Sequence, residues 1–122
     1  MTNYPPLSPE DKTKIRCALA DAFVDTAVDY AYIARQIQGY DIALVEEIFF
    51  SQVTAACHWN AQTPIPPIWT GFDDEWLEAE IEEILRARRE SWLKRNVDKL
   101  LVIWWRFRFK DFWLEIKNSV PE

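Results

Sequence analysis

Apolar side chains recur every three or four residues along most of the chain, and the first such stripe starts near Pro9. Ser8 stands before it as a capping residue, and Asp11 occupies the position where a capping box places an acidic or amide side chain. These signals predict a helix from Pro9 to about Val24, with Arg16 outside its apolar face. That face consists of Ile15, Ala18, Leu19, Ala22 and Phe23.

Two further helices are expected before the first long interruption of the pattern. The second spans residues 26–38 or 27–38 and ends at Gly39, which supplies a left-handed C-terminal position. Asp41 caps the third helix, whose apolar stripe continues to about Cys57. This stripe is wide, so we expect the third helix to be central.

The helical pattern breaks between Asn60 and Gly71. Three prolines within this stretch remove backbone donors and favour extended geometry in the residues that precede them. Ile65, Ile68 and Trp69 are too apolar for a solvated linker. The stretch is therefore expected to be a crossing loop that packs on the helices, and not a boundary between domains.

A fourth helix is expected to be capped by Asp73 or Asp74 and to run to about Leu93. Its acidic residues come first and its basic residues last, which is the order that the helix dipole favours. We expect its inward residues to be Trp76, Leu77, Ile81, Ile84, Leu85 and Trp92.

The last segment, 96–118, contains two conflicting patterns. Residues 105–110 alternate between aromatic and basic side chains, as in a strand, whereas the segment as a whole keeps helical spacing. A lone strand would have no partner in this chain, so we predict a helix with a break near Lys110. Its inward residues are expected to be Val97, Leu100, Leu101, Trp104, Phe107, Phe112 and Ile116.

These elements together predict an all-α fold, namely a single compact bundle of about five helices with the proline-rich loop between the third and the fourth. A length of 122 residues suits one domain over residues 1–122. We expect residues 1–8 to form a flexible N-terminal segment.

Composition indicates a cytoplasmic protein. The longest apolar run, residues 100–105, is far shorter than the roughly 20 residues of a membrane span, so no membrane partner is expected. The N-terminus lacks the basic start and apolar run of a signal peptide. Cys17 and Cys57 fit no metal or redox motif and are expected to be reduced.

Charge is divided unevenly along the chain. The net charge is -6, but residues 1–85 contain 15 acidic and 4 basic residues, whereas residues 86–122 contain 10 basic and 5 acidic residues. Such asymmetry indicates charged partners and fast association.

No catalytic, metal or cofactor site is expected. His58 is the only histidine, and its neighbour Cys57 would project about 100° away from it on a helix, so the two side chains are poorly placed to act as a nucleophile and its base. The aromatic and basic residues of 105–110 have the composition of a single-stranded nucleic-acid platform. An amphipathic helix explains the same residues, and the acidic portion opposes a polyanion, so direct nucleic-acid binding is not favoured.

Acidic residues provide the candidate partner-binding site. Asp21, Asp25 and Asp29 lie four apart, which makes them either caps at helix ends or a ridge for a positive partner. The other candidates are at the start of the fourth helix, where acids also complement the helix dipole. They are Asp73, Asp74, Glu75, Glu78 and Glu82.

Residues 18–26 (ALADAFVDT) and 68–77 (IWTGFDDEWL) carry a family resemblance. They resemble an uncharacterised family of small bacterial helical proteins with a Leu-Ser-Asp-Leu-Phe-Leu-Asp-Thr motif and a Trp-x-Gly-Phe-Asp turn before a helix. The likeness spans residues 15–85, with Ala20 and Ala22 in place of the usual Ser and Leu. It implies a bacterial, helical, non-secreted domain and transfers no catalytic residue. It draws attention to Asp21, Asp25, Trp69, Gly71, Phe72 and Asp73.

The leading functional hypothesis is a non-enzymatic inhibitor, an immunity protein that neutralises a basic toxin or nuclease domain through an acidic surface. One alternative is a phage or mobile-element antagonist that mimics nucleic acid. Another is an enzyme with a metal and carboxylate site, which would require several acids to converge in a pocket.

Overall fold

The computed structural model describes residues 7–23, 28–62 and 74–120. Every regular element within these ranges is helical and none is a strand, which confirms the all-α prediction. Two short segments are a 3₁₀ turn, η1 (Asp21–Phe23), and a π-helical segment, η2 (Phe49–Val53). The α-helices are α1 (Pro9–Ala20), α2 (Tyr30–Ile37), α3 (Ile42–Ile48), α4 (Thr54–Gln62), α5 (Asp74–Glu90), α6 (Trp92–Arg108) and α7 (Lys110–Ser119).

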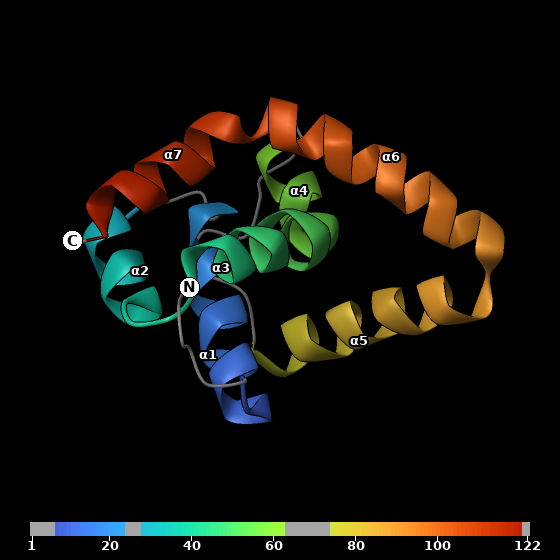
Figure 1. The fold of residues 1–122 in the computed structure, drawn as a ribbon, viewed down its shortest axis with the longest axis horizontal. Coiled ribbons are helices and arrows are strands. Elements are labelled where there is room, and N and C mark those ends of the chain that lie inside the picture. Colours follow the sequence, from blue (N-terminus) through green and yellow to red (C-terminus); the bar gives the residue numbers. More distant parts are fainter. Residues whose placement is uncertain (1–6, 24–27, 63–73, 121–122) are drawn as a thin grey trace.

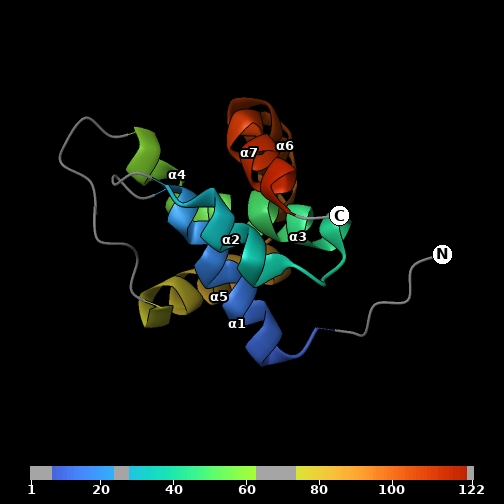
Figure 2. The same ribbon diagram turned by 90° about the vertical axis from the view of Figure 1, so that its left-hand side faces the viewer.

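A continuous helical run, α3–η2–α4, lies in the middle of the molecule (Figure 1). The helices α6 and α7 form an arch on one side of this run, and α1 and α5 lie on the other side (Figures 1 and 2). Helix α2 packs against both α1 and α7. The central position expected for the third helix is therefore confirmed. No helix in the described ranges is long and apolar enough to cross a membrane.

Local capping signals fix several helix ends as expected. The Ser8 hydroxyl accepts a hydrogen bond from the backbone N–H of Asp11, and the Asp11 carboxylate accepts one from the N–H of Ser8. Asp41 caps α3 by accepting from the N–H of Ala43. Gly39 follows α2 with φ +93°, a left-handed conformation in which an L side chain would be strained.

Other boundaries differ from the prediction. Helix α2 begins at Tyr30 because Asp29 caps it, so its start is later than residues 26 or 27. The fourth helix ends at Glu90 and not at Leu93. Ser91 has extended backbone geometry, and its hydroxyl accepts from the N–H of Lys94 to start α6. Residues 60–62, where the crossing loop was expected to begin, are wrong in the prediction because α4 continues through them to Gln62. The rest of that loop, the cap at Asp73 and residues 1–6 lie outside the described residues.

The core is centred on an aromatic cluster that joins distant parts of the chain. The ring of Phe23 lies 5.6 Å from that of Phe49, 5.3 Å from that of Phe109 and 5.4 Å from that of Phe112, measured between centroids. Trp113 contacts Phe49 from α7 at 5.7 Å. The Phe23–Phe49 pair is stacked and the others are edge-to-face or tilted, and aromatic pairs at these distances add stability beyond the area they bury.

The π-helical segment η2 places two adjacent phenylalanines in this core. Phe49 and Phe50 are both almost fully buried, although neighbours on an α-helix project about 100° apart. The wider turn of a π-helix reduces that separation. Thr54, which follows the segment, is also buried, and its hydroxyl donates to the carbonyl oxygen of Phe49 at 2.7 Å.

Helix α6 is rotated relative to the prediction. Its buried side chains are Asp98 and Trp105, followed by Phe109 at the break before α7. A carboxylate is rarely buried without a partner, and Arg88 provides one for Asp98. The expected break near Lys110 is confirmed. The residues of the fourth and fifth predicted helices that were wrongly expected to face inward are Trp76, Trp92, Val97, Leu100, Trp104 and Phe107.

The rotation of α6 gives a direct test with two phenylalanines. Phe109 is 0% exposed and Phe107 is 74% exposed. Replacing Phe109 with Ala should lower the free energy of unfolding by about 3–5 kcal/mol, because it removes a buried ring and leaves a cavity. Replacing Phe107 with Ala should change it by less than about 0.5 kcal/mol. Urea denaturation of both variants measures the difference, and equal effects would contradict the rotation.

Candidate functional site

The packing of α1 against α5 brings acidic residues from distant parts of the sequence onto one surface, which we call the acidic α1–α5 surface. Asp21 lies at the C-terminal end of α1, and Asp74 begins α5. Both line a pocket of about 370 Å³ between the two helices and α2. We define the surface by Asp21, Asp74, Glu75, Glu78 and Glu82.

The carboxylates of Asp21 and Asp74 repel each other. Burial raises the pKa of Asp21, and the neighbouring charge of Asp74 raises it further. No ion pair within the described ranges involves Asp21, Asp74 or Glu75. Lys14 also lines the pocket but forms no ion pair with either aspartate, so this part of the surface holds negative charge that no ion pair of the described residues neutralises.

Cys17 lies in the same pocket, and its thiol is a weak nucleophile. Burial raises the pKa of its thiol to about 12, with a smaller contribution from a hydrogen bond to Asp74. Burial likewise raises the pKa of the Cys57 thiol well above its ordinary range. Both thiols are protonated at neutral pH, and a protonated thiol is a poor nucleophile.

Arg16 is a buried cation that links α1 to η2 and to the acidic residues of α5. Its Nη1 donates to Glu78 Oε2 at 2.8 Å, and its Nε donates to Gln52 Oε1 at 2.9 Å. Glu82 Oε2 lies 3.7 Å from Nη1, while the Glu82 side chain stays mostly exposed. The expectation that Arg16 faces away from the core is wrong, because its side chain is only 7% exposed. The partly buried Glu78 carboxylate is thus already paired with a cation of the protein itself.

The remaining sequence-predicted residues separate into two groups. Asp29 caps α2, with its Oδ1 accepting from the N–H of Tyr32 at 3.0 Å. The capping interpretation is therefore confirmed for this residue. Asp25 and Asp73 lie outside the described residues. The structure thus joins Asp21 to the α5 acids, whereas Asp29 does not line their pocket.

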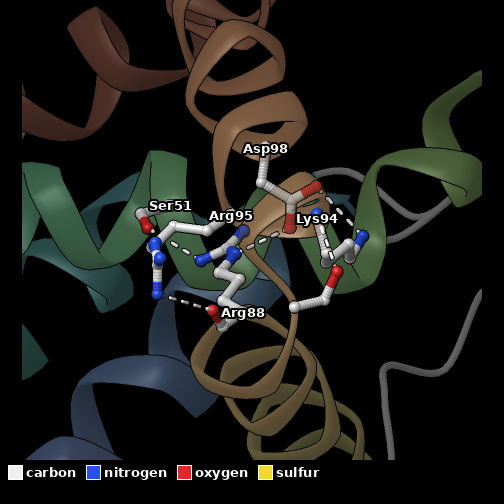
Figure 3. Close-up of polar contacts among 6 residues, drawn as sticks. Ser51, Arg88, Lys94, Arg95 and Asp98 are labelled. Carbon is white, nitrogen blue, oxygen red and sulfur yellow. Dashed lines mark hydrogen bonds and ion pairs between the residues drawn. The ribbon is translucent and has the colours of Figure 1, made fainter.

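Sequence reasoning missed a buried polar cluster where α5 turns into α6 (Figure 3). Arg88 Nε donates to Asp98 Oδ2 at 2.7 Å, and Arg88 Nη1 donates to the hydroxyl of Ser51 at 3.1 Å. Lys94 pairs with the other oxygen of Asp98 at 3.0 Å. Ser51, Arg88 and Asp98 line a second pocket of about 390 Å³, which we call the hairpin pocket. Its other lining residues are Glu47, Arg95, Lys99, Val102 and Arg106. The sequence does contain a sign of this cluster, because Asp98 places a carboxylate among the apolar residues of α6.

The described residues contain no cluster of three or more His, Cys, Asp or Glu side chains arranged to hold a metal ion. His58 lies against the ring of Trp105, with centroids 5.2 Å apart. The two rings are tilted by 37°, and His58 lies within α4, which continues past the expected end near Cys57 to Gln62.

A family model described as "Domain of unknown function (DUF7079)" matches residues 10–119. The chain belongs to this family. Membership confirms the expectation of an uncharacterised family, and it transfers no catalytic residue to the DUF7079 chain. No curated protein and no solved structure matches the sequence.

The contribution of the buried Arg16 ion pair to stability can be compared with that of an exposed ion pair on the same DUF7079 chain. Arg16→Ala should lower the free energy of unfolding by about 2–3 kcal/mol, because it leaves the partly buried Glu78 carboxylate unpaired. Arg86 pairs with Glu83 and Glu90 on the exposed side of α5, so Arg86→Ala should have little effect. Equal losses in urea denaturation would show that Arg16 has no special role.

Asp21 should make stability depend on pH in a defined direction. The pKa of Asp21 in the folded protein is raised above its ordinary value of 3.8. The free energy of unfolding should therefore fall as the pH rises from 3.8 through the folded pKa, because the charged form is less favourable in the folded protein. Asp21→Asn should therefore raise the Tm at pH 7, and the difference should vanish below pH 3.8. Thermal melts at both pH values measure it. A lower Tm at pH 7 would contradict the raised pKa.

Proposed function

We propose that this DUF7079 chain is a protein-binding module, an immunity protein that neutralises a bacterial toxin domain with a basic surface. The observation that carries the proposal is the unneutralised negative charge of the acidic α1–α5 surface. Asp74 and Glu75 are exposed on the first turn of α5, and Asp21 stands beside Asp74 without an ion pair within the described ranges.

Bringing a cation to this surface has a clear energetic advantage. A Lys or Arg from a partner would relieve the repulsion between Asp21 and Asp74, and it would displace no internal cation. Nucleic-acid-cleaving toxins present basic grooves to phosphates, so an acidic surface both fits such a groove and accelerates encounter.

A rigid frame supports binding without large rearrangement. Arg16 links α1, η2 and α5 through Gln52 and Glu78, so the acids are held on helices that are tied to the core. Surfaces that keep their geometry on binding lose less conformational entropy. The proposal assigns no catalysis to the chain, in keeping with two protonated thiols. It places the inhibitor in the cytoplasm.

The proposal is tested with toxin candidates encoded next to this gene. The purified chain should bind and neutralise one of them. Asp74→Asn/Glu75→Gln should slow association by about tenfold at low salt, because these charges steer the encounter. Biolayer interferometry measures the rates, and co-expression measures the rescue of growth.

A charge-matched control separates the site from net charge. Asp111→Asn/Glu115→Gln removes two exposed acids from α7 and should leave the association rate nearly unchanged. Failure of every neighbouring candidate to bind, or equal slowing by both double variants, would refute the proposal. Capture of a host nuclease that the acidic variants no longer bind would instead assign the surface to a nucleic-acid mimic.

A further inference from the structure

Helix α6 presents a broad apolar face to solvent, which we call the outer face of α6. Its side chains are between 44 and 74% exposed, a large fraction for residues of this kind. Contiguous exposed apolar patches on this scale mark interaction surfaces. The outer face consists of Trp92, Leu93, Val97, Leu100, Ile103, Trp104 and Phe107.

The outer face is wide. At about 100° per residue, its side chains cover an arc of about 140° around the helix. Asn96 is the one polar residue inside this arc, and its side-chain amide donates to the carbonyl oxygen of Trp92 at 2.8 Å. Its polar group is thereby satisfied. The arc is broader than the narrow stripe that contacts a single partner helix in a coiled coil, so it fits a flat surface better.

Basic residues border the outer face on both sides. Lys99 lies at one edge and Arg108 at the other, and neither forms an ion pair with another described residue. Beside Lys99 opens the hairpin pocket, where four cationic side chains outnumber two carboxylates. Arg95, in that pocket, also has no carboxylate partner within the described ranges. The surroundings of this face therefore favour an anionic surface.

A second copy of the chain fits the outer face poorly. Two such faces packed together would bring the basic borders of one helix against those of the other, and like charges across a helical seam are unfavourable. Helix α1, which has Asp21 at its C-terminal end, lies across the central α3–η2–α4 run from α6 (Figures 1 and 2), whereas α5 packs directly against α6.

We propose that α6 binds peripherally to an anionic lipid bilayer, with its axis parallel to the membrane surface. The apolar side chains enter the boundary between headgroups and acyl chains, and Lys99 and Arg108 contact lipid phosphates. Trp, Phe and Leu on one face with Lys and Arg beside them are the composition of interfacial helices. The expectation of no membrane partner rested on the lack of a membrane-spanning segment, which surface binding does not require. The proposal is independent of the toxin-inhibitor function.

Co-sedimentation of the full chain with unilamellar vesicles tests the proposal. Binding is expected to vesicles of equal parts phosphatidylglycerol and phosphatidylcholine, and much less to phosphatidylcholine alone. Leu100→Glu should weaken binding roughly tenfold or more, because the leucine side chain that enters the bilayer is replaced by a charged one. Lys99→Gln/Arg108→Gln should weaken it about fivefold for each charge removed. All of these positions are exposed, and circular dichroism checks that the variants stay helical.

Matched variants elsewhere serve as controls. Leu44→Glu on α3 makes the same change at another exposed leucine, and Lys12→Gln/Arg35→Gln removes one Lys and one Arg from α1 and α2. Both should bind like the wild type. The proposal is overturned if the wild-type chain does not sediment with anionic vesicles, if neutral vesicles bind it equally, or if controls and test variants behave alike. A dimer that Leu100→Glu dissociates, found by analytical ultracentrifugation without vesicle binding, would assign the face to a second copy.

Discussion

The ion pair between Arg88 and Asp98 fixes how α6 is rotated on the rest of the protein. A carboxylate is stable inside a protein only when a cation and hydrogen bonds replace its water, and Arg88 supplies both from the preceding helix. With Asp98 held inward, Trp105 and Phe109 follow it into the core at helical spacing. The opposite side of the helix, with its tryptophans and leucines, is thereby turned to solvent.

Local features of the fold were predictable because the residues that cause them are close in sequence. The cap at Ser8, the left-handed Gly39 and the cap at Asp41 each depend on a few neighbouring residues. The break after α6 was likewise predictable from nearby residues, because the spacing of apolar side chains changes over residues 105–110. The rotation of α6 was not predictable, since apolar spacing alone gives two faces to choose between and Arg88 lies ten positions away. Ser91, which ends the preceding helix, was hidden within a continuous run of helix-forming residues.

The candidate site also combines features set by nearby residues with features set by tertiary contacts. The acids of α1 and α5 were each recognisable from the sequence, but their meeting depends on Arg16, which bonds to residues 36 and 62 positions away. One predicted site residue, Glu78, is used in that contact and holds the frame. The like-charge pair of Asp21 and Asp74 arises from tertiary packing, so no pattern within either helix announces it.

The π-helical segment constrains how this family can vary in length. A π turn holds one more residue than an α turn, and here it places Phe49, Phe50 and Val53 in the core at once. Removal of one residue from this stretch would restore α-helical spacing and leave the direction of α4 nearly unchanged, because the wider turn is what accommodates the extra residue. Cys57 would keep its present neighbours, but adjacent positions would again project about 100° apart, and Phe49 and Phe50 could not both stay in the core. A deletion here among relatives should therefore change the aromatic core and leave the orientation of α4 intact.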